Sequence, residues 1–272
     1  MVLTYFNYAH ILTLLLSAGL ISAFYFPLRK KSLYAKEVAL FVLMGFNFAQ
    51  HLLKFLIWPH LWGTGFGVGN TAYNVCAILI IATPFVYLGK SALLKQYMAY
   101  VGTIGAAITL VFPYWFAGID ILSSEFWRFW TCHTLLVATS LLPALWGTVE
   151  FDYRDGWKFG LIFLLMLSLI LTNNTAFFLA FGEATTDTLY DALLAQNPLW
   201  MMSPAGGFEA LKPVFEALSP GIFLQTDTHP YIPILWYAIP MYLMVTIIAY
   251  ILGGAIDRKR LIGSSRKMIK HP

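Results

Sequence analysis

Two side chains in this sequence, Cys76 and His133, have the chemistry of a nucleophile and a general base. Each lies in a long apolar run, where polar groups are tolerated when they find partners inside the protein. In such a pair the imidazole takes the thiol proton and the thiolate attacks an acyl carbonyl. Amide donors such as Asn74 and Asn173 would stabilise the resulting oxyanion. The chemistry that these residues predict is acyl transfer.

A polar stripe on a neighbouring run is expected to support this site. Asn47, His51 and Lys54 follow i, i+4, i+7 spacing and therefore share one face of a helix. The stripe fits either interhelical hydrogen bonds, with Lys54 extending outward to the membrane surface, or the wall of a binding cavity. A cation near the thiol, either Lys54 or Arg128, would offset part of the cost of holding a thiolate away from water.

Four apolar runs bring polar groups to one level in the outer half of the membrane. At 1.5 Å per helical residue, His51 and His133 each lie roughly 10 Å below the outer boundary. The amides of Asn173 and Asn174 lie about as deep, and Cys76 is somewhat shallower. Such groups are expected to face the interior of a helix bundle. The two neighbouring amides either pack against another helix or mark a local unwinding of their own.

The composition that surrounds these residues is that of an integral membrane protein. The chain is 59% hydrophobic and 11% charged, with a mean hydropathy of +0.71, which excludes a water-soluble core. We predict an all-α polytopic fold with seven transmembrane helices in a single membrane domain, residues 1–272. The runs that are long and apolar enough to cross a membrane are 8–26, 37–57, 73–89, 98–117, 126–147, 158–181 and 232–253.

The basic residues predict the orientation of these helices. With the N-terminus outside and the C-terminus cytoplasmic, every Lys and Arg except Lys54, Arg128 and Lys212 falls on the cytoplasmic side, as the positive-inside rule requires. The net charge of +4 therefore reflects topology, and no nucleic acid is expected as a partner. The basic cytoplasmic tail, 254–272, is expected to contact anionic lipid headgroups.

One outer segment, residues 182–231, is too long for a simple loop and contains several prolines among apolar side chains. Within it the sequence FEAL occurs twice, seven residues apart. The repeat aligns Phe208, Leu211, Phe215 and Leu218 as one apolar stripe. This pattern predicts an amphipathic segment that lies on the outer membrane interface or caps the helices as a lid. A gating role for the segment predicts altered activity when its phenylalanines are made polar.

The order and spacing of the polar residues resemble the YwaF family of integral membrane proteins, whose vertebrate relative, transmembrane protein 164, is a lipid acyltransferase. The resemblance covers residues 37–181. It rests on YNVCAIL with the following Pro84, on AITLVFP, on HTLLVATSLLP and on TNNTAFF, and more weakly on HPYIPILWYAIP. At the third helix this chain has TAYNVC where bacterial members commonly have Leu-Pro-Leu-His-Leu-Cys, so Asn74 stands in place of a histidine.

The resemblance implies that Cys76 is the nucleophile and His133 its histidine, in an acyltransferase that acts on phospholipid or lysophospholipid acyl chains. Membrane lipids would be its partners, and the substrate would enter from the outer leaflet. No cofactor is expected. The location would be a membrane, and the plasma membrane if the source is bacterial.

Two other interpretations fit the same polar residues. A non-catalytic receptor or transporter would bind a small amphiphile through His51, Asn173 and Asn174. A bis-histidine haem protein would use His51 and His133 as iron ligands. No metal site is predicted, because the cysteines and histidines lack the spacing of zinc ligands. The glycine-rich GTGFGVGN lacks the strand-turn-helix context of a phosphate-binding loop and is expected to be a flexible outer loop.

Overall fold

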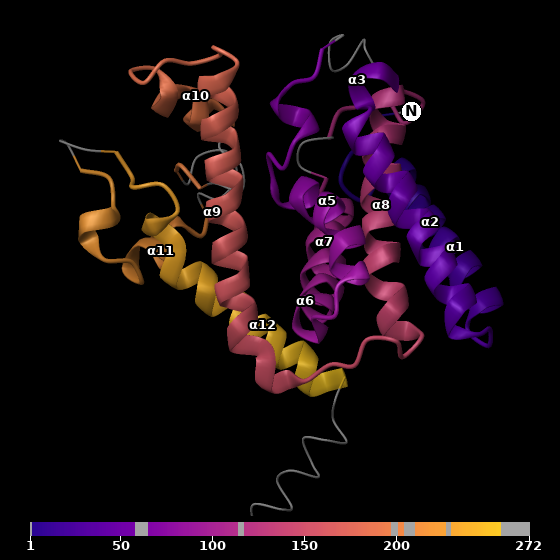
Figure 1. Ribbon diagram of the computed structural model, residues 1–272. Helices are drawn as coiled ribbons and strands as arrows, with labels where there is room; N and C mark the ends of the chain where they lie inside the picture. Colours follow the sequence, from indigo (N-terminus) through magenta and orange to yellow (C-terminus); the bar gives the residue numbers. More distant parts are fainter. Residues whose placement is uncertain are drawn as a thin grey trace, which may run out of the picture. The chain divides into compact units, whose positions relative to one another are not determined.

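The computed structural model describes residues 2–57, 65–113, 117–196, 201–203, 210–226 and 230–256 (Figure 1). Within these ranges every regular element is helical, apart from one isolated β-bridge between Val2 and Asp120. The predicted all-α class is confirmed. The chain divides into two compact units. Unit 1 comprises Met1–Ala72 and Cys76–Glu150, and unit 2 comprises Tyr73–Val75 and Phe151–Pro272.

Unit 1 holds the helices of the first five predicted runs. They are α1 (Tyr8–Leu28), α2 (Leu33–Leu52), α3 (Lys54–Ile57), the 3-10 turn η1 (Val68–Asn70), α5 (Val75–Leu88), α6 (Ala92–Tyr97), the π-helical turn η2 (Met98–Gly102), α7 (Thr103–Val111) and α8 (Ser124–Leu145). Asn7, Ser32, Ser91 and Ser123 precede α1, α2, α6 and α8, and each accepts a first-turn N–H through its side chain. These caps set where the four helices begin.

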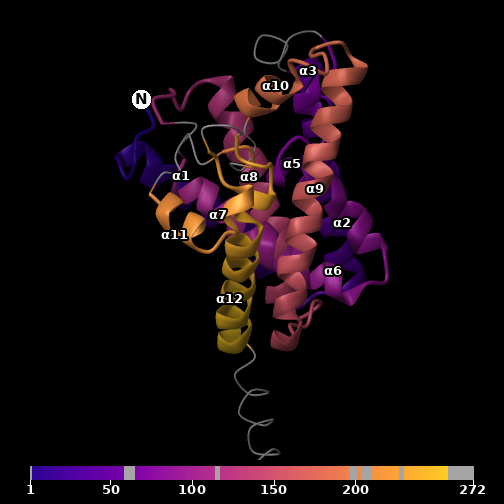
Figure 2. The same cartoon turned by 90° about the vertical axis from the view of Figure 1, so that its left-hand side faces the viewer.

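Unit 2 is organised around two long helices. Its elements are η4 (Tyr153–Asp155), α9 (Gly156–Ala180), α10 (Leu189–Gln196), α11 (Lys212–Ala217), η6 (Gly221–Phe223), η7 (Leu235–Tyr237) and α12 (Ala238–Ile256). α9 and α12 pack against each other (Figures 1 and 2). A Cβ added at Gly160 of α9 would lie 2.5 Å from the Tyr242 ring and 2.6 Å from Thr246 Oγ1. The close approach of the two helices therefore depends on glycine at this position.

Helices occupy all seven predicted runs, but they differ in continuity. Four described helices are long and apolar enough to cross a membrane by length and composition, and these are Tyr8–Leu28, Val68–Leu88, Tyr153–Ala180 and Leu235–Gly254. The second run is interrupted at Leu53, between α2 and α3, and the fourth is divided by the π-helical turn η2. The predicted tail begins inside α12, which extends to Ile256, and its remainder lies outside the described residues.

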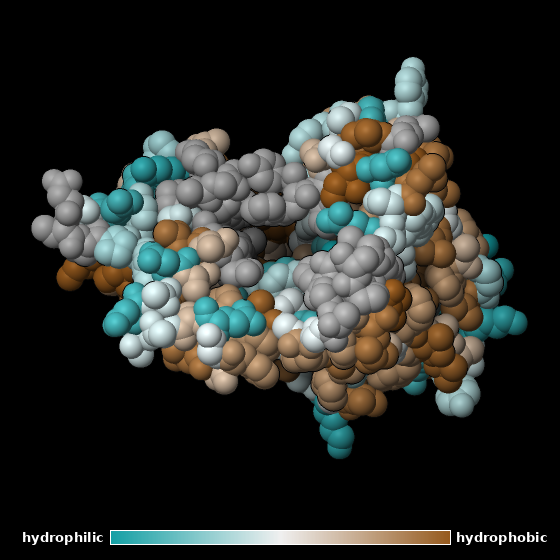
Figure 3. Space-filling view, turned by 90° about the horizontal axis from the view of Figure 1, so that it is seen from above, coloured by the Kyte–Doolittle hydropathy of each residue, from teal (hydrophilic) through white to brown (hydrophobic). Residues whose placement is uncertain are grey.

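The surface of unit 1 is apolar where a soluble protein would be polar. On α2 the exposed side chains include Tyr34, Val38, Val42 and Phe46, one helical turn apart. The opposite face buries Asn47, Gln50 and His51, and Lys54 follows on α3. α1 likewise exposes leucines and buries Ala9, His10, Thr13 and Ser17. Exposed apolar side chains are visible as brown areas in Figure 3. This inverted pattern is the one that a lipid environment requires.

α8 is the central helix of unit 1 and packs against α1, α2, η2 and α7. Hydrogen bonds join it to its neighbours within the apolar interior. Ser17 Oγ lies 2.9 Å from Thr134 Oγ1 and accepts a bond from Trp130 Nε1, also at 2.9 Å. On the other side, Asn47 Nδ2 donates to the Cys132 carbonyl at 3.2 Å. Polar contacts of this kind set the register of helices that have no hydrophobic reason to associate in lipid.

A buried histidine that the sequence analysis did not single out, His10, joins α1 to the end of α7. Its Nε2 lies 2.9 Å from the Leu110 carbonyl, and its Nδ1 accepts from the Phe6 amide at 2.9 Å. Because a carbonyl can only accept, Nε2 carries the hydrogen and the ring is neutral with both nitrogens used. His10 therefore has a structural role, since it satisfies a carbonyl in the last turn of α7.

The outer segment of unit 2 packs on an aromatic cluster. Phe215 of α11 is buried, and its ring centroid lies 6.4 Å from that of Trp236. The Tyr231 hydroxyl donates to Glu216 Oε1. Burial, together with this carboxylate, raises the pKa of Tyr231 above its usual range. Of the predicted apolar stripe, Leu211 and Leu218 are exposed, and Phe208 lies outside the described residues.

Replacement of Gly160 with valine is expected to lower the stability of the fold by about 1–3 kcal/mol, because the new side chain overlaps Tyr242 and Thr246. Thermal unfolding in detergent measures the change. The matched control is Gly19→Ala in α1, where an added Cβ meets nothing within 4 Å. Equal melting temperatures for the two variants would show that α9 and α12 are not closely packed at Gly160.

Candidate functional site

Cys76 is the second residue of α5 and is half-buried, and Asn74 stands immediately before the helix. Asparagine is favoured at that position because its side chain can accept a first-turn N–H. The Cys76 thiol lies beside the Thr109 side chain of α7. The Thr109 hydroxyl donates to the Gly105 carbonyl at 2.8 Å.

His133 lies near the middle of α8 and is half-buried. Its Nδ1 lies 2.9 Å from the Phe129 carbonyl, one turn earlier on the same helix. Because the carbonyl only accepts, Nδ1 carries the hydrogen and Nε2 keeps a lone pair. The Phe129 ring also contacts the imidazole, with the centroids 4.5 Å apart. This tautomer is the one that a general base acting through Nε2 needs.

Within the described residues no hydrogen bond joins Cys76 to His133, whose Nδ1 is bonded to the Phe129 carbonyl. The pairing of the two side chains stays a prediction.

The polar stripe of α2 serves first as a link between helices. Asn47 Nδ2 donates to the Cys132 carbonyl, and its Oδ1 accepts from Gln50 Nε2 at 2.8 Å. Gln50 was not among the residues chosen from the sequence, although it lies three residues from Asn47 and thus on the same helical face. The expected interhelical hydrogen bond is therefore present, and it places Asn47 at the level of Cys132.

Lys54 and His51 both bind the glycine-containing segment that follows the outer end of α3. Lys54 Nζ donates to the Gly69 carbonyl, and His51 Nε2 lies 3.0 Å from the Thr71 carbonyl. Lys54 is 1% exposed. The expectation that its side chain extends to the membrane surface is wrong, because the ammonium finds a carbonyl acceptor inside the fold.

The same segment is also fastened by Asn70, which the sequence analysis passed over. Asn70 Nδ2 donates to the Leu52 carbonyl at 3.1 Å, and its Oδ1 accepts from the Gly67 amide at 3.1 Å. The described part of GTGFGVGN is therefore a turn bonded to the end of α2, and the expected flexible loop is wrong for these residues. The dipeptide Gly69-Asn70 is a turn signal that would have indicated this.

Arg128 is half-buried on α8, one turn before Cys132. It thus lies on a helix that packs against α2, which carries His51 and is followed by α3 with Lys54.

In unit 2, Asn174 of α9 is 1% exposed and its Nδ2 donates to the Tyr73 carbonyl at 3.1 Å. Its Oδ1 accepts from Asn173 Nδ2 at 3.1 Å. α9 continues without interruption through both residues, so the alternative of a local unwinding is wrong. The amides bond through their side chains and leave the helical backbone intact. Asn174 thereby holds the residues immediately before Cys76, since Tyr73–Val75 belong to unit 2.

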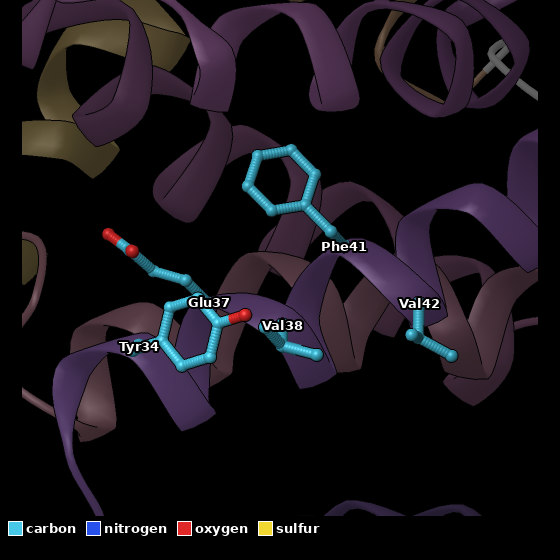
Figure 4. Close-up of a pocket in the computed structure, with 5 residues that line it drawn as sticks. All are labelled: Tyr34, Glu37, Val38, Phe41 and Val42. Atoms are coloured by element: carbon cyan, nitrogen blue, oxygen red, sulfur yellow. The ribbon is translucent and has the colours of Figure 1, made fainter.

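Two further features lie apart from these residues. Among the residues that the structure describes, no three His, Cys, Asp or Glu side chains form a group suited to a metal ion. A surface hollow on the exposed face of α2 is lined by Tyr34, Glu37, Val38, Phe41 and Val42 (Figure 4). None of the predicted site residues lines this hollow.

A family model describing the TMEM164 family matches residues 5–252, which is nearly the whole chain. The chain belongs to the TMEM164 family. The predicted relation to transmembrane protein 164 is confirmed, whereas the YwaF name stays a prediction. No curated protein and no solved structure matches the chain significantly. Membership of the TMEM164 family, together with the apolar helices, identifies an integral membrane protein.

Replacement of Asn174 with leucine is expected to release Tyr73 and to expose the nucleophile candidate of this TMEM164-family protein. The measurement uses a Cys132→Ser background, in which Cys76 is the remaining cysteine. Alkylation of the Cys76 thiol by a small maleimide should become about threefold faster or more in the Asn174→Leu variant, because loss of one such hydrogen bond favours local opening by about that factor. Asn173→Leu is the matched control, because the Asn174–Tyr73 bond remains. Equal alkylation rates in the two variants would contradict an anchoring role for Asn174.

Proposed function

We propose that this TMEM164-family protein is an acyltransferase for phospholipid or lysophospholipid acyl chains, with Cys76 as nucleophile and His133 as general base. The observation that carries the proposal is the position of Cys76 in the first turn of α5. The positive end of a helix dipole favours an anion there, and first-turn amides have no acceptor within the helix. A thiolate and the oxyanion formed by its attack would both be stabilised at such a site.

The tautomer of His133 supports its role in this proposal. Its Nδ1–H is held by the Phe129 carbonyl, so Nε2 is the nitrogen able to take a proton. Catalysis requires the Cys76 thiol to reach His133 when a lipid enters. A rotation of the Cys76 side chain about one bond is the smallest motion that would achieve this.

The proposed reaction has two acyl-transfer steps. His133 Nε2 takes the thiol proton, and Cys76 Sγ attacks the ester carbonyl carbon of a phospholipid. The ester C–O bond breaks, the leaving lysophospholipid oxygen takes the proton from His133, and the acyl group remains on Cys76 as a thioester. In the second step His133 takes the hydroxyl proton of an acceptor lysophospholipid. The acceptor oxygen attacks the thioester, and the released thiolate recovers its proton.

The seven-span topology with an outer N-terminus belongs to this proposal. Residues near the predicted outer ends contact each other, as His10 contacts Leu110 and Asn174 contacts Tyr73. At the predicted inner ends, Thr83 Oγ1 lies 3.8 Å from Met98 Sδ. Helices that alternate in direction across a membrane would make such contacts, because their outer ends lie at one level and their inner ends at another. The inverted polarity of α2 supports a membrane span although its polar stripe lowers its mean hydropathy.

The outer segment 182–231 would lie on the outer membrane surface. Leu211, Val214, Leu218 and Ile222 expose apolar side chains around α11 and η6. Such a surface fits the boundary between acyl chains and headgroups, where partly apolar segments are stable. The basic tail would bind anionic lipid headgroups on the cytoplasmic side of the membrane. This membrane would be the plasma membrane if the source is bacterial.

Labelling of the purified protein with a thiol-directed acyl probe tests the nucleophile and its base. Cys76→Ser should abolish labelling, and His133→Ala should slow it by about 100-fold or more, as loss of a general base does. Cys132→Ser is the matched control and should label at the wild-type rate. If Cys76 reacts no faster than Cys132 and is indifferent to His133→Ala, the protein has no activated thiol and the enzyme proposal fails.

Single cysteines in a Cys76→Ser, Cys132→Ser background test the topology. Leu122→Cys, at an exposed site before α8, should react with a membrane-impermeant maleimide added to intact cells. Tyr153→Cys, before α9, should react only after the membrane is permeabilised. The helix α8 lies between the two sites in the chain, so a span there places them on opposite sides of the membrane. Labelling of both sites in intact cells would place them on one side and would exclude the seven-span arrangement.

A further inference from the structure

The exposed face of α2 carries one carboxylate among apolar side chains. Glu37 is exposed, and together with Tyr34, Val38, Phe41 and Val42 it lines a single surface hollow (Figure 4). The opposite face of α2 binds α8, so this hollow faces away from α8. Apolar side chains on such a face suit the acyl chains of a membrane, but a carboxylate there is costly unless a cation meets it.

Glu37 differs from two other carboxylates that are predicted to lie on the inner side. Asp152 Oδ2 lies 2.7 Å from Arg154 Nη2. Asp155 Oδ1 lies 2.6 Å from Lys158 Nζ. Glu37 forms no ion pair with any residue that the structure describes. Its carboxylate is therefore free to meet a cation that comes from the surrounding membrane.

The position of the hollow along α2 matches the inner boundary of the membrane. Glu37 is the first residue of the predicted span 37–57, at its inner end. It is thus expected at the level of the inner headgroups, and Phe41 lies about 6 Å deeper, among the acyl chains. Tyr34 lies about 4.5 Å nearer the cytoplasm, at the level where tyrosine hydroxyls meet the membrane surface. The hollow therefore extends from the headgroups to the acyl chains.

We infer that this hollow binds an inner-leaflet phospholipid with a primary ammonium headgroup, namely phosphatidylethanolamine. The ammonium has three N–H donors that can bond to the Glu37 carboxylate, whereas the methylated ammonium of a choline headgroup has none. The Tyr34 hydroxyl would donate to the phosphate, and Val38, Phe41 and Val42 would contact an acyl chain. This lipid is bound and not converted, so the inference goes beyond the proposed acyl transfer and takes from it only the orientation of the helices.

A second copy of the chain is the other occupant that an apolar face of this kind could have. In a symmetric pair with its two-fold axis along the membrane normal, the face of α2 would meet the same face of the partner. Glu37 would then stand opposite the same carboxylate of the other copy, and like charges repel strongly away from water. A lipid ammonium supplies the opposite charge at that position. Charge complementarity therefore favours the lipid.

Native mass spectrometry of the full-length protein in a non-ionic detergent measures the binding of phosphatidylethanolamine and of phosphatidylcholine with the same acyl chains. Phosphatidylethanolamine should bind about fivefold more tightly, because choline cannot make the exposed charge-assisted hydrogen bond. Glu37→Gln should abolish this preference, whereas Val42→Ser should weaken the binding of both lipids alike. Glu183→Gln is the matched control, because it removes an exposed carboxylate away from the hollow, and it should keep the preference. Equal affinity of the wild type for the two lipids, or a preference that survives Glu37→Gln, overturns the inference.

Disulfide cross-linking in a Cys76→Ser, Cys132→Ser background tests the second copy directly. Val42→Cys on α2 and Leu15→Cys on α1 replace side chains that are equally exposed, at 64% each. In vesicles that contain phosphatidylethanolamine, oxidation should cross-link the two variants to the same low extent. Stronger cross-linking at Val42→Cys would show that two copies meet at the hollow and would overturn the inference. In the otherwise native chain, Glu37→Gln should leave acyl-probe labelling of Cys76 at the wild-type rate, so failure of one proposal leaves the other standing.

Discussion

Lipid offers no hydrogen bonds, and this constraint governs how unit 1 is built. Its helices turn their apolar faces outward and their polar faces toward each other, as the exposed valines and buried amides of α2 show. α1 follows the same pattern, with His10, Thr13 and Ser17 on its buried face. The interior of the unit therefore contains polar groups among its apolar side chains. Each of these groups must find a protein partner, and those partners determine which helices lie side by side.

α8 is the helix on which most of these contacts converge. Ser17 reaches it from α1 and Asn47 reaches it from α2, so hydrogen bonds align three helices that also share an apolar cluster around Leu142. This alignment has consequences for chemistry. It sets Arg128 level with His51, since each lies one turn from the bonded pair of Asn47 and Cys132. The same bonds that hold the bundle together thus decide which polar residues of α2 and α8 lie at one level.

The proposed chemistry draws on features of different origin. The position of Cys76 at a helix start and the tautomer of His133 are local, since each is set within one helix or its first turn. The bonds of Lys54 to Gly69 and of His51 to Thr71 are tertiary features, because each joins residues of separate elements. Asn174 adds a third kind of contribution, since it holds the backbone that leads into Cys76.

The sequence by itself determined the membrane class, the all-α architecture, the seven helical runs and the TMEM164 relation. These follow from composition, from apolar run length and from local motifs, which do not depend on distant contacts. It also selected Asn47 and Asn174 as buried polar residues, because amides within apolar runs must face protein. Tertiary structure alone decided what each side chain bonds to. Lys54 turns inward to Gly69, α9 remains helical through its paired amides, and Asn174 donates to the backbone of Tyr73. Hydrogen bonds act over about 3 Å, and residues far apart in sequence come that close only once the helices have packed.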